Sequence, residues 1–468
     1  MRPLTIIVLC ISSLIVTAQI TFEKVVKRAG AEYLSSVIQT ADGGFAAMGE
    51  CTGGNDKWLV RTDAMGDTLW TRVYPGIGNN QQGDRYFAET SEGGFTFLSY
   101  LPYKATLAHV DATGQPVWEK ELFPGLGYAL FPTSGGYLIA GQGSDSAYMS
   151  NLTICKVTLN GDLTWKRTYL TVPLGHMLSI HPQAIRETRQ GEYIVAGNFY
   201  SGFFMNTPFL FRISPSGDSL WCKQYRRSGD DAIYSVDTTA DGGFIACGWI
   251  NSNSTAYAIK VDNAGDTLWT NANFLLSGDQ FFNSVLSTTD GGAVVCGQTS
   301  NTDFGPDTNK VYLVKFSTSG SIEWERKIGT LGSSSGICID RTSDHGYVIC
   351  GYVNPYDTSY RGGGLLIKTD ANGNFAGTKE SEKLSDYKVF PNPAFDHITF
   401  SFPIRMISSR TITFYDLFGK EVYIKQVPQG QTRVTVETGS WRPGLFLYVI
   451  SDGSRNITGK ICILGNRH

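Results

Sequence analysis

Residues 41–70 read ADGGFAAMGECTGGNDKWLVRTDAMGDTLW, and they contain the pattern that decides the fold. A glycine pair is followed at once by an aromatic residue, Phe45, and four positions later by another glycine, Gly49. A second turn, DAMGD at 63–67, then leads into Trp70. Glycines supply the positive φ that tight hairpins need, and the apolar residues between the turns favour strands. The stretch therefore predicts short antiparallel strands joined by hairpins.

The same pattern recurs along most of the chain, at intervals of 47 to 56 residues. The seven copies of the second-turn glycine are Gly66, Gly114, Gly161, Gly217, Gly265, Gly320 and Gly373. Six of the nine tryptophans follow this turn at one repeat position: Trp70, Trp118, Trp165, Trp221, Trp269 and Trp324. Self-similarity at a fixed period is the signature of a repeat architecture. The chain therefore contains seven units of about fifty residues.

Each unit predicts four short strands, which in the first unit span residues 33–39, 44–49, 57–62 and 68–74. A lone four-stranded sheet cannot cover both of its faces, so such units pack face to face around an axis. The repeated tryptophan then lies between neighbouring units as part of the core. The predicted fold class is all-β, with a seven-bladed β-propeller over residues 19–378.

The two ends of this region complement each other. The last unit lacks its fourth strand, because the sequence after 370–374 has no outer-strand tryptophan. Near the N-terminus, residues 20–30 match the fourth strand of the other units. We predict that this strand, Phe22 to Ala29, completes the seventh blade and removes two open sheet edges.

The composition and the first residues fit an exported globular protein. The 468 residues carry a formal net charge of −3, which provides no basic field for nucleic acid as a partner. Arg2 and the apolar run from Leu4 to Val16 predict a signal peptide over residues 1–18. The run is shorter than the ~20 apolar residues that a spanning helix needs.

A separate region follows the charged linker at 379–386, where the repeat period stops. Alternating apolar and polar residues in four stretches predict a small β-sandwich over the remaining residues, 387–468. The four stretches are residues 397–402, 410–415, 433–437 and 445–450.

The motifs of this region occur in a definite order. VFPNPA begins at 389, YDLFGKEV at 415 and PGLFLYVI at 443, and a Gly-Lys pair ends at 460. In this order they resemble the type IX secretion (Por) C-terminal sorting domain of Bacteroidetes. The residues that match its motifs are Pro391, Asn392, Pro393, Asp416, Gly419, Gly444 and Lys460.

This resemblance implies that the secretion machinery recognises the C-terminal domain and moves the protein across the outer membrane. The domain is then removed, and the rest is secreted or attached to the outer face of the outer membrane. The alternative interpretation is an ordinary accessory sandwich.

The repeats show no set of residues that would form a catalytic, cofactor or metal site. The segment from Asp111 to Trp118 resembles quinoprotein-like and kelch-type propeller repeats, but only in residues that build the blade. The six histidines have no spaced acidic partners that would complete a metal site. We therefore predict no cofactor, no metal and no catalytic residue. Cys338 and Cys350 are either buried apolar fillers or a cross-strand disulfide.

The connections between second and third strands are the long, variable loops, and they suggest where a ligand binds. Exposed aromatic residues on a rigid scaffold favour recognition, although they can also fold back over the blade. The predicted function is a monomeric binding or scaffold protein whose partner is an extracellular protein or glycan. The alternative is an extracellular glycoside hydrolase or lyase. The predicted ligand contacts are Phe199, Tyr200, Phe203, Phe204, Tyr356, Tyr360 and Arg361.

Overall fold

The computed structural model of the chain separates into two compact units, residues 1–376 and 377–468. The structure describes residues 19–27, 32–51, 56–75, 85–101, 103–144, 149–173, 179–201, 205–227, 229–250, 255–272, 280–300, 309–329, 332–354, 362–375, 388–401, 410–416, 420–428, 431–451 and 456–464. The predicted signal peptide lies outside these residues.

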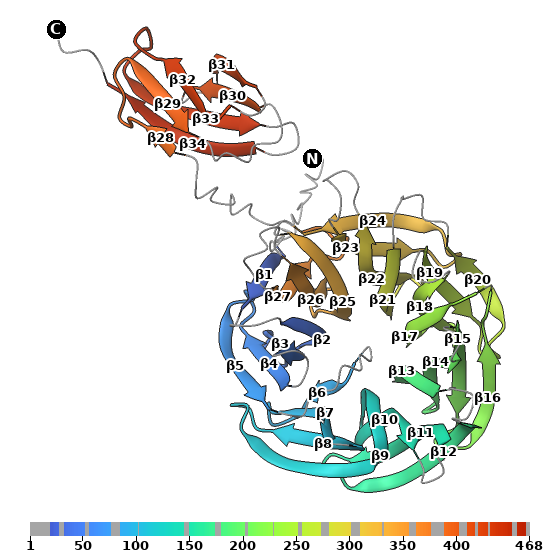
Figure 1. Ribbon diagram of the computed structural model, residues 1–468. Helices are drawn as coiled ribbons and strands as arrows, with labels where there is room; N and C mark the ends of the chain where they lie inside the picture. The colour runs from blue at the N-terminus through green and yellow to red at the C-terminus, as the bar shows by residue number, and fades with distance from the viewer. Residues whose placement is uncertain are drawn as a thin grey trace, which may run out of the picture. The chain divides into compact units, whose positions relative to one another are not determined.

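The first unit is a ring of four-stranded antiparallel blades around a common axis (Figure 1). Blade 1 consists of β2 (Tyr33–Gln39), β3 (Phe45–Cys51), β4 (Asp56–Thr62) and β5 (Thr68–Tyr74). Blade 2 consists of β6 (Phe87–Glu89), β7 (Phe95–Leu101), β8 (Lys104–Val110) and the first part of β9 (Pro116–Thr133). Blade 3 consists of the second part of β9, β10 (Gly136–Ser144), β11 (Met149–Thr158) and β12 (Leu163–Pro173). Strand β9 therefore serves as outer strand of one blade and inner strand of the next.

The remaining blades repeat this order from the axis outwards. Blade 4 consists of β13 (Ser179–Glu187), β14 (Tyr193–Ser201), β15 (Met205–Ile213) and β16 (Ser219–Gln224). Blade 5 consists of β17 (Ala232–Thr238), β18 (Phe244–Ile250), β19 (Thr255–Val261) and β20 (Thr267–Asn271). Blade 6 consists of β21 (Gln280–Ser287), β22 (Ala293–Ser300), β23 (Asn309–Phe316) and β24 (Ile322–Ile328). Blade 7 consists of β25 (Ser333–Arg341), β26 (Tyr347–Asn354), β27 (Gly363–Thr369) and β1 (Phe22–Val26).

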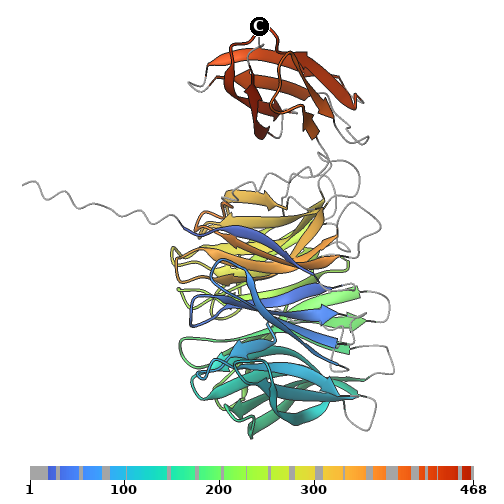
Figure 2. The same ribbon diagram turned by 90° about the vertical axis from the view of Figure 1, so that its left-hand side faces the viewer.

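The N-terminal strand closes the ring. Strand β1 pairs antiparallel with β27, from Phe22 opposite Lys368 to Val26 opposite Gly364. Figure 2 shows β1 in blue among the orange strands of blade 7. The prediction of an all-β, seven-bladed propeller closed by its N-terminal strand is confirmed. The strand itself ends at Val26, before the predicted end.

Neighbouring blades meet through one repeated contact, an outer-strand tryptophan against the turn glycine of the next blade. A Cβ atom added at Gly320 would come within 2.5 Å of the ring of Trp269. Gly320 also has a φ of 83°, in the left-handed region that favours glycine. Glycine meets both requirements, and the tryptophan fills the space that the missing side chain leaves. The same contact joins Trp70 with Gly114, Trp118 with Gly161, Trp165 with Gly217, Trp221 with Gly265, and Trp324 with Gly373.

Phe22 takes the place of the missing seventh tryptophan. A Cβ atom added at Gly66 of blade 1 would lie 2.6 Å from the Phe22 ring. That ring meets Phe45 edge-on at a centroid distance of 5.6 Å, as Trp70 meets Phe95 at 6.3 Å. The predicted role of the tryptophans as core between blades is confirmed, and the closing strand copies it.

Buried lysines on the third strands hold the turns between first and second strands. Their side chains are at most 7% exposed, and each bonds to a turn aspartate. Burial alone would raise the pKa of these aspartates, but hydrogen bonds from the lysine, a threonine hydroxyl and a backbone N–H lower each pKa to about 2. The pairs are Lys260–Asp241 at 2.6 Å, Lys315–Asp290 at 2.8 Å and Lys368–Asp344 at 2.9 Å.

The second unit is a sandwich of two antiparallel sheets, as predicted. One sheet contains β28 (Lys388–Phe390), β29 (His397–Ser401) and β32 (Arg433–Glu437). The other contains β31 (Glu421–Val427), β30 (Arg410–Tyr415), β33 (Gly444–Ser451) and β34 (Asn456–Ile463). Phe400 of the first sheet packs between the sheets against Phe414 and Tyr448, at centroid distances of 5.9 and 5.1 Å.

Replacing Phe22 by alanine should lower the free energy of unfolding of the propeller by about 3 kcal/mol, because the variant loses a buried ring at the closure of the sheet. Denaturation of the full chain, followed by tryptophan fluorescence, measures this change. The control is Phe390→Ala, since Phe390 is 42% exposed in the other unit. An unchanged propeller transition in the Phe22 variant would show that β1 does not close the ring.

The aspartates of the buried pairs predict a pH dependence of stability. Their pKa of about 2 lies below the 3.8 of an ordinary aspartate, so they stabilise the fold fully above about pH 4. This contribution is lost as the pH falls from about 4 to 2. Replacing Asp241, Asp290 and Asp344 by asparagine should therefore flatten the decline of stability over that range, measured by urea denaturation. A decline as steep as in the unaltered protein would refute this assignment.

Candidate functional site

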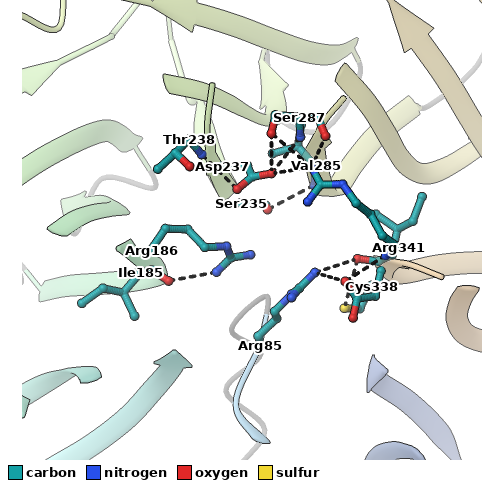
Figure 3. A network of polar contacts seen from close by, with 12 residues as sticks. Arg85, Ile185, Arg186, Ser235, Asp237, Thr238, Val285, Ser287, Cys338 and Arg341 are labelled. Carbon is teal, nitrogen blue, oxygen red and sulfur yellow. Dashed lines mark hydrogen bonds and ion pairs between the residues drawn. The ribbon is translucent and has the colours of Figure 1, made fainter. Parts of the chain in front are cut away.

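Charged side chains from four blades and a serine from a fifth lie near the axis of the ring (Figure 3). Arg85 precedes β6, and the others lie at the ends of β13, β17, β21 and β25. This set is named the axial collar, and it consists of Arg85, Arg186, Asp237, Ser287, Asp340 and Arg341.

Arg341 links blade 7 to blades 5 and 6. Its Nη2 donates to Oδ2 of Asp237 at 3.3 Å, to Oγ of Ser287 at 3.1 Å, and to the carbonyl oxygen of Ser287. The same carboxylate oxygen accepts the Ser287 N–H at 2.8 Å, and Oδ1 accepts the Thr238 N–H at 2.9 Å. Both oxygens of Asp237 are therefore occupied within the protein.

Arg85 links blade 2 to blade 7. Its Nη2 lies 2.6 Å from Oδ1 of Asp340, which also accepts the backbone N–H of Arg341 at 2.9 Å. The side chains of Arg85 and Asp340 are 18% and 19% exposed. A charge-assisted bond that is this well shielded is stronger than an exposed surface ion pair.

Arg186 brings a third guanidinium from blade 4. Its side chain is buried, its Nη1 donates to the carbonyl oxygen of Ile185 at 2.9 Å, and its guanidinium lies 5.9 Å from the Phe131 ring centroid. Figure 3 shows this side chain extending towards the axis, the region into which Arg85 extends from blade 2. Three arginine side chains, from blades 2, 4 and 7, thus lie near the axis of the ring.

Sequence reasoning missed the axial collar, although the repeat contains a signal for it. Arg186, Asp237 and Asp340 each stand seven residues before the aromatic position of their blade. In blades 1, 2 and 6 the same position is apolar, as Ile38, Ala88 and Leu286 show. A position that is apolar in some repeats and charged in others marks a departure from the requirements of blade packing.

Two of the predicted ligand contacts lie at the end of β14, and both are half-buried. Phe199 packs against Phe209 with a centroid distance of 4.7 Å and joins the hydrophobic core. Tyr200 stacks on His181 at 6.1 Å with an angle of 5° between the rings, and His181 stacks on Tyr128 at 5.7 Å. Burial lowers the pKa of His181, which favours the neutral ring in this stack.

The other predicted contacts, Phe203, Phe204, Tyr356, Tyr360 and Arg361, lie outside the residues that the structure describes. The aromatic stack of Tyr128, His181 and Tyr200 was not predicted, because its members come from blades 3 and 4 and share no sequence motif.

The predicted sorting residues have structural roles in the second unit. Asn392 donates from Nδ2 to the Lys460 carbonyl oxygen at 3.0 Å, and its Oδ1 accepts the Cys462 N–H at 2.9 Å. Pro391 and Pro393 flank this asparagine, which ties its segment to β34. Asp416 accepts the Lys420 N–H at 3.0 Å in the turn between β30 and β31, and Gly444 begins β33. Gly419 lies outside the described residues.

Cys338 and Cys350 face each other in the register of β25 and β26, and both are buried free thiols in the structure. Within the described part of the chain, no group of three or more metal-ligating side chains occurs. The described residues likewise contain no helix of the length and apolarity that crossing a membrane requires.

Residues 388–464 match a protein family described as "Secretion system C-terminal sorting domain". The resemblance drawn from the motifs is therefore confirmed, and the C-terminal unit is the sorting domain of type IX secretion. Proteins with this domain are secreted or attached to the cell surface, and the domain implies interaction with the secretion machinery. No curated protein matches the chain.

Several solved structures are similar to the chain at low identity. A mutant puromycin hydrolase in complex with PGG has a TM-score of 0.41 and 15% identity, over 69% of this chain and 51% of that chain. Another puromycin hydrolase structure has a TM-score of 0.46 and 12% identity, over 81% and 61%. The dihydro-heme d1 dehydrogenase NirN in complex with DHE has a TM-score of 0.44 and 12% identity, over 86% and 76%. The chain thus spans 51% and 61% of the puromycin hydrolase chains that it resembles.

Proposed function

We propose that the propeller is a non-enzymatic binding or scaffold domain, which the sorting domain delivers to the outside of the cell. The observation that carries this proposal is the arrangement of the two carboxylates in the axial collar. Asp237 and Asp340 direct their oxygens at arginine side chains and backbone N–H groups. A general acid or base must instead reach a proton of the substrate. The two carboxylates are therefore better suited to hold the arginine side chains in place than to transfer protons to or from a substrate.

The closed ring supports a binding role, because it holds its loops on a rigid frame. Six junctions between blades are held by the tryptophan contact and the seventh by Phe22, and β1 removes the open edge. Loops on such a frame lose little further entropy when they bind a partner.

The proposed partner is an extracellular protein or glycan that meets the loops between second and third strands. Tyr200 is the described residue best placed for contact, because its ring extends the stack formed by Tyr128 and His181. Phe199 supports the end of β14 through its packing on Phe209. Aromatic side chains bury much area at low entropic cost, so they suit this role. The further proposed contacts are Phe203, Phe204, Tyr356, Tyr360 and Arg361.

Deleting residues 387–468 should leave the propeller folded but retain it in the periplasm, because the sorting domain and the propeller are separate compact units. Cell fractionation and immunoblotting of the culture medium measure this outcome. The matched control is a fluorescent protein placed between residues 1–18 and 387–468, which should be exported. Normal export of the truncated chain would refute the assignment.

Replacing Phe203, Phe204, Tyr356 and Tyr360 by serine should weaken binding at least tenfold, because hot-spot aromatic residues carry most of the energy of an interface. The full mature chain is first tested against panels of polysaccharides and matrix proteins, and the best ligand is then titrated. The control variant, Asp63→Asn with Asp262→Asn, changes the turns at the opposite end of the blades.

Lost affinity in the control and retained affinity in the serine variant would place binding at the other end of the ring. Chemical conversion of the bound ligand would contradict the non-enzymatic part of the proposal.

A further inference from the structure

We propose that the sorting domain docks on the secretion machinery through the outer face of its four-stranded sheet. The partner is a subunit of that machinery that presents an apolar surface bordered by acidic side chains. This inference rests on the proposed delivery of the propeller by the sorting domain, and it names the surface that the machinery recognises. The surface is called the sheet face, and it consists of Tyr415, Ile424, Leu445, Leu447, Val449 and Cys462.

The residues of the sheet face form one continuous patch. Alternate residues of β33 belong to the core of the sandwich, so the residues between them, Leu445, Leu447 and Val449, lie on the outer face. The register places Leu447 opposite Tyr415 of β30, and Leu445 opposite Cys462 of β34. Side chains that stand directly opposite each other in neighbouring strands lie within contact distance. The exposed apolar residues are therefore neighbours across three strands.

The patch is open to solvent. Leu445 and Leu447 are 40% and 39% exposed, and Ile424 of β31 is 44% exposed. Ile424 extends the patch to a fourth strand, because it stands opposite Thr413, which in turn stands opposite Val449. An exposed and contiguous apolar patch is typical of a surface that binds another protein.

The sequence of β33 also indicates a second cover. Residues 445–450 are apolar without a break, a pattern that is typical of a strand buried on both faces. In the described part of this unit, the core of the sandwich covers one face of the strand. A docked partner would cover the other.

The other sheet of the sandwich has a polar outer face. An antiparallel sheet that faces water normally alternates apolar residues inside with polar residues outside. This sheet follows the rule, since its outward positions are His397, Thr399 and Ser401 in β29, and Arg433, Thr435 and Glu437 in β32. Both sheets share one core, so the contrast assigns docking to the four-stranded sheet.

Of the residues that match the sorting motifs, Lys460 borders the sheet face. Asn392 bonds to the backbone of β34 through both polar atoms of its side chain, and Asp416 accepts the Lys420 N–H. These two residues are thus engaged in the fold of the domain. Lys460, in contrast, is exposed and stands opposite Leu447, so it places a positive charge at the edge of the patch.

The charge of the region favours an acidic partner. Residues 387–468 contain ten lysines and arginines against five aspartates and glutamates, whereas the whole chain carries a net charge of −3. Two copies of this region repel each other, which disfavours pairing of sheet faces between two copies of the chain. A partner with acidic side chains around an apolar surface complements both the charge and the patch.

The test replaces Ile424, Leu445 and Leu447 by threonine in the full chain. Threonine suits a strand but removes much of the apolar area of the patch. Cell fractionation should show about tenfold less protein outside the cell than for the unaltered chain, because the central apolar residues carry most of the energy of an interface. The folded variant should accumulate in the periplasm.

The matched control makes the same kind of change in the propeller, as Leu69→Thr with Leu220→Thr and Leu268→Thr. These side chains are 58%, 46% and 55% exposed, and the control should be exported like the unaltered chain. Thermal unfolding of each purified chain, followed by circular dichroism, shows whether both units are folded.

If the threonine variant fails to fold, Leu447→Trp decides the question. Tryptophan also suits a strand, but it adds bulk at the place where the partner must approach. Export of the folded Leu447→Trp chain should therefore fall as well.

Unaltered export of the folded sheet-face variants would overturn the inference. If deletion of residues 387–468 nevertheless stops export, the assignment of the sorting domain stands, and the proposed binding by the propeller loops is unaffected. Analytical ultracentrifugation tests for another occupant. A dimer of the unaltered chain that the threonine variant abolishes would assign the sheet face to a second copy of this chain, and would likewise overturn the inference.

Discussion

The packing of a tryptophan on the turn glycine of the next blade is the interaction on which the rest of the structure depends. A Cβ atom at these glycines would come within 2.5 to 3.4 Å of the tryptophan ring, and the positive φ of the turn disfavours other residues as well. Each blade thereby covers one face of its neighbour, and a four-stranded sheet that could not stand alone becomes part of a continuous core. Phe22 extends the same contact to the seventh junction, where the sequence has no tryptophan. Closure of the ring therefore follows from one repeated contact.

Because this clamp lies on the outer strands, the inner strand ends are released from the requirements of blade packing. The position that is Ile38 in blade 1 can therefore become Arg186, Asp237 or Asp340 in other blades. Asp340, for example, bonds to Arg85, which stands 255 positions earlier in the chain. The scaffold thus brings a charged site together at the axis while the sorting domain, a separate compact unit, provides export.

The sequence was sufficient for the fold and insufficient for the site, for a physical reason. A turn glycine recurs in all seven units and a tryptophan in six, because both meet the same packing requirement, so the repeat period reveals them. The missing fourth strand of the last unit then points to residues near Phe22. The collar residues satisfy no local demand. Arg85 and Arg341 acquire a role only when the ring closes and brings blades 2, 5, 6 and 7 to one axis. Burial of Phe199 against Phe209 was likewise unpredictable, since an aromatic residue near a loop can face either solvent or core.

A double-mutant cycle between Trp269 and Gly320 tests the central contact most directly. Free energies of unfolding are measured for the unaltered chain, Trp269→Ala, Gly320→Ala and the double variant. If the ring and the glycine share one space, the cost of Gly320→Ala should shrink in the Trp269→Ala background, with a coupling of about 1–2 kcal/mol. Costs that add within about 0.5 kcal/mol would contradict the account, because they would show that the two residues do not depend on each other.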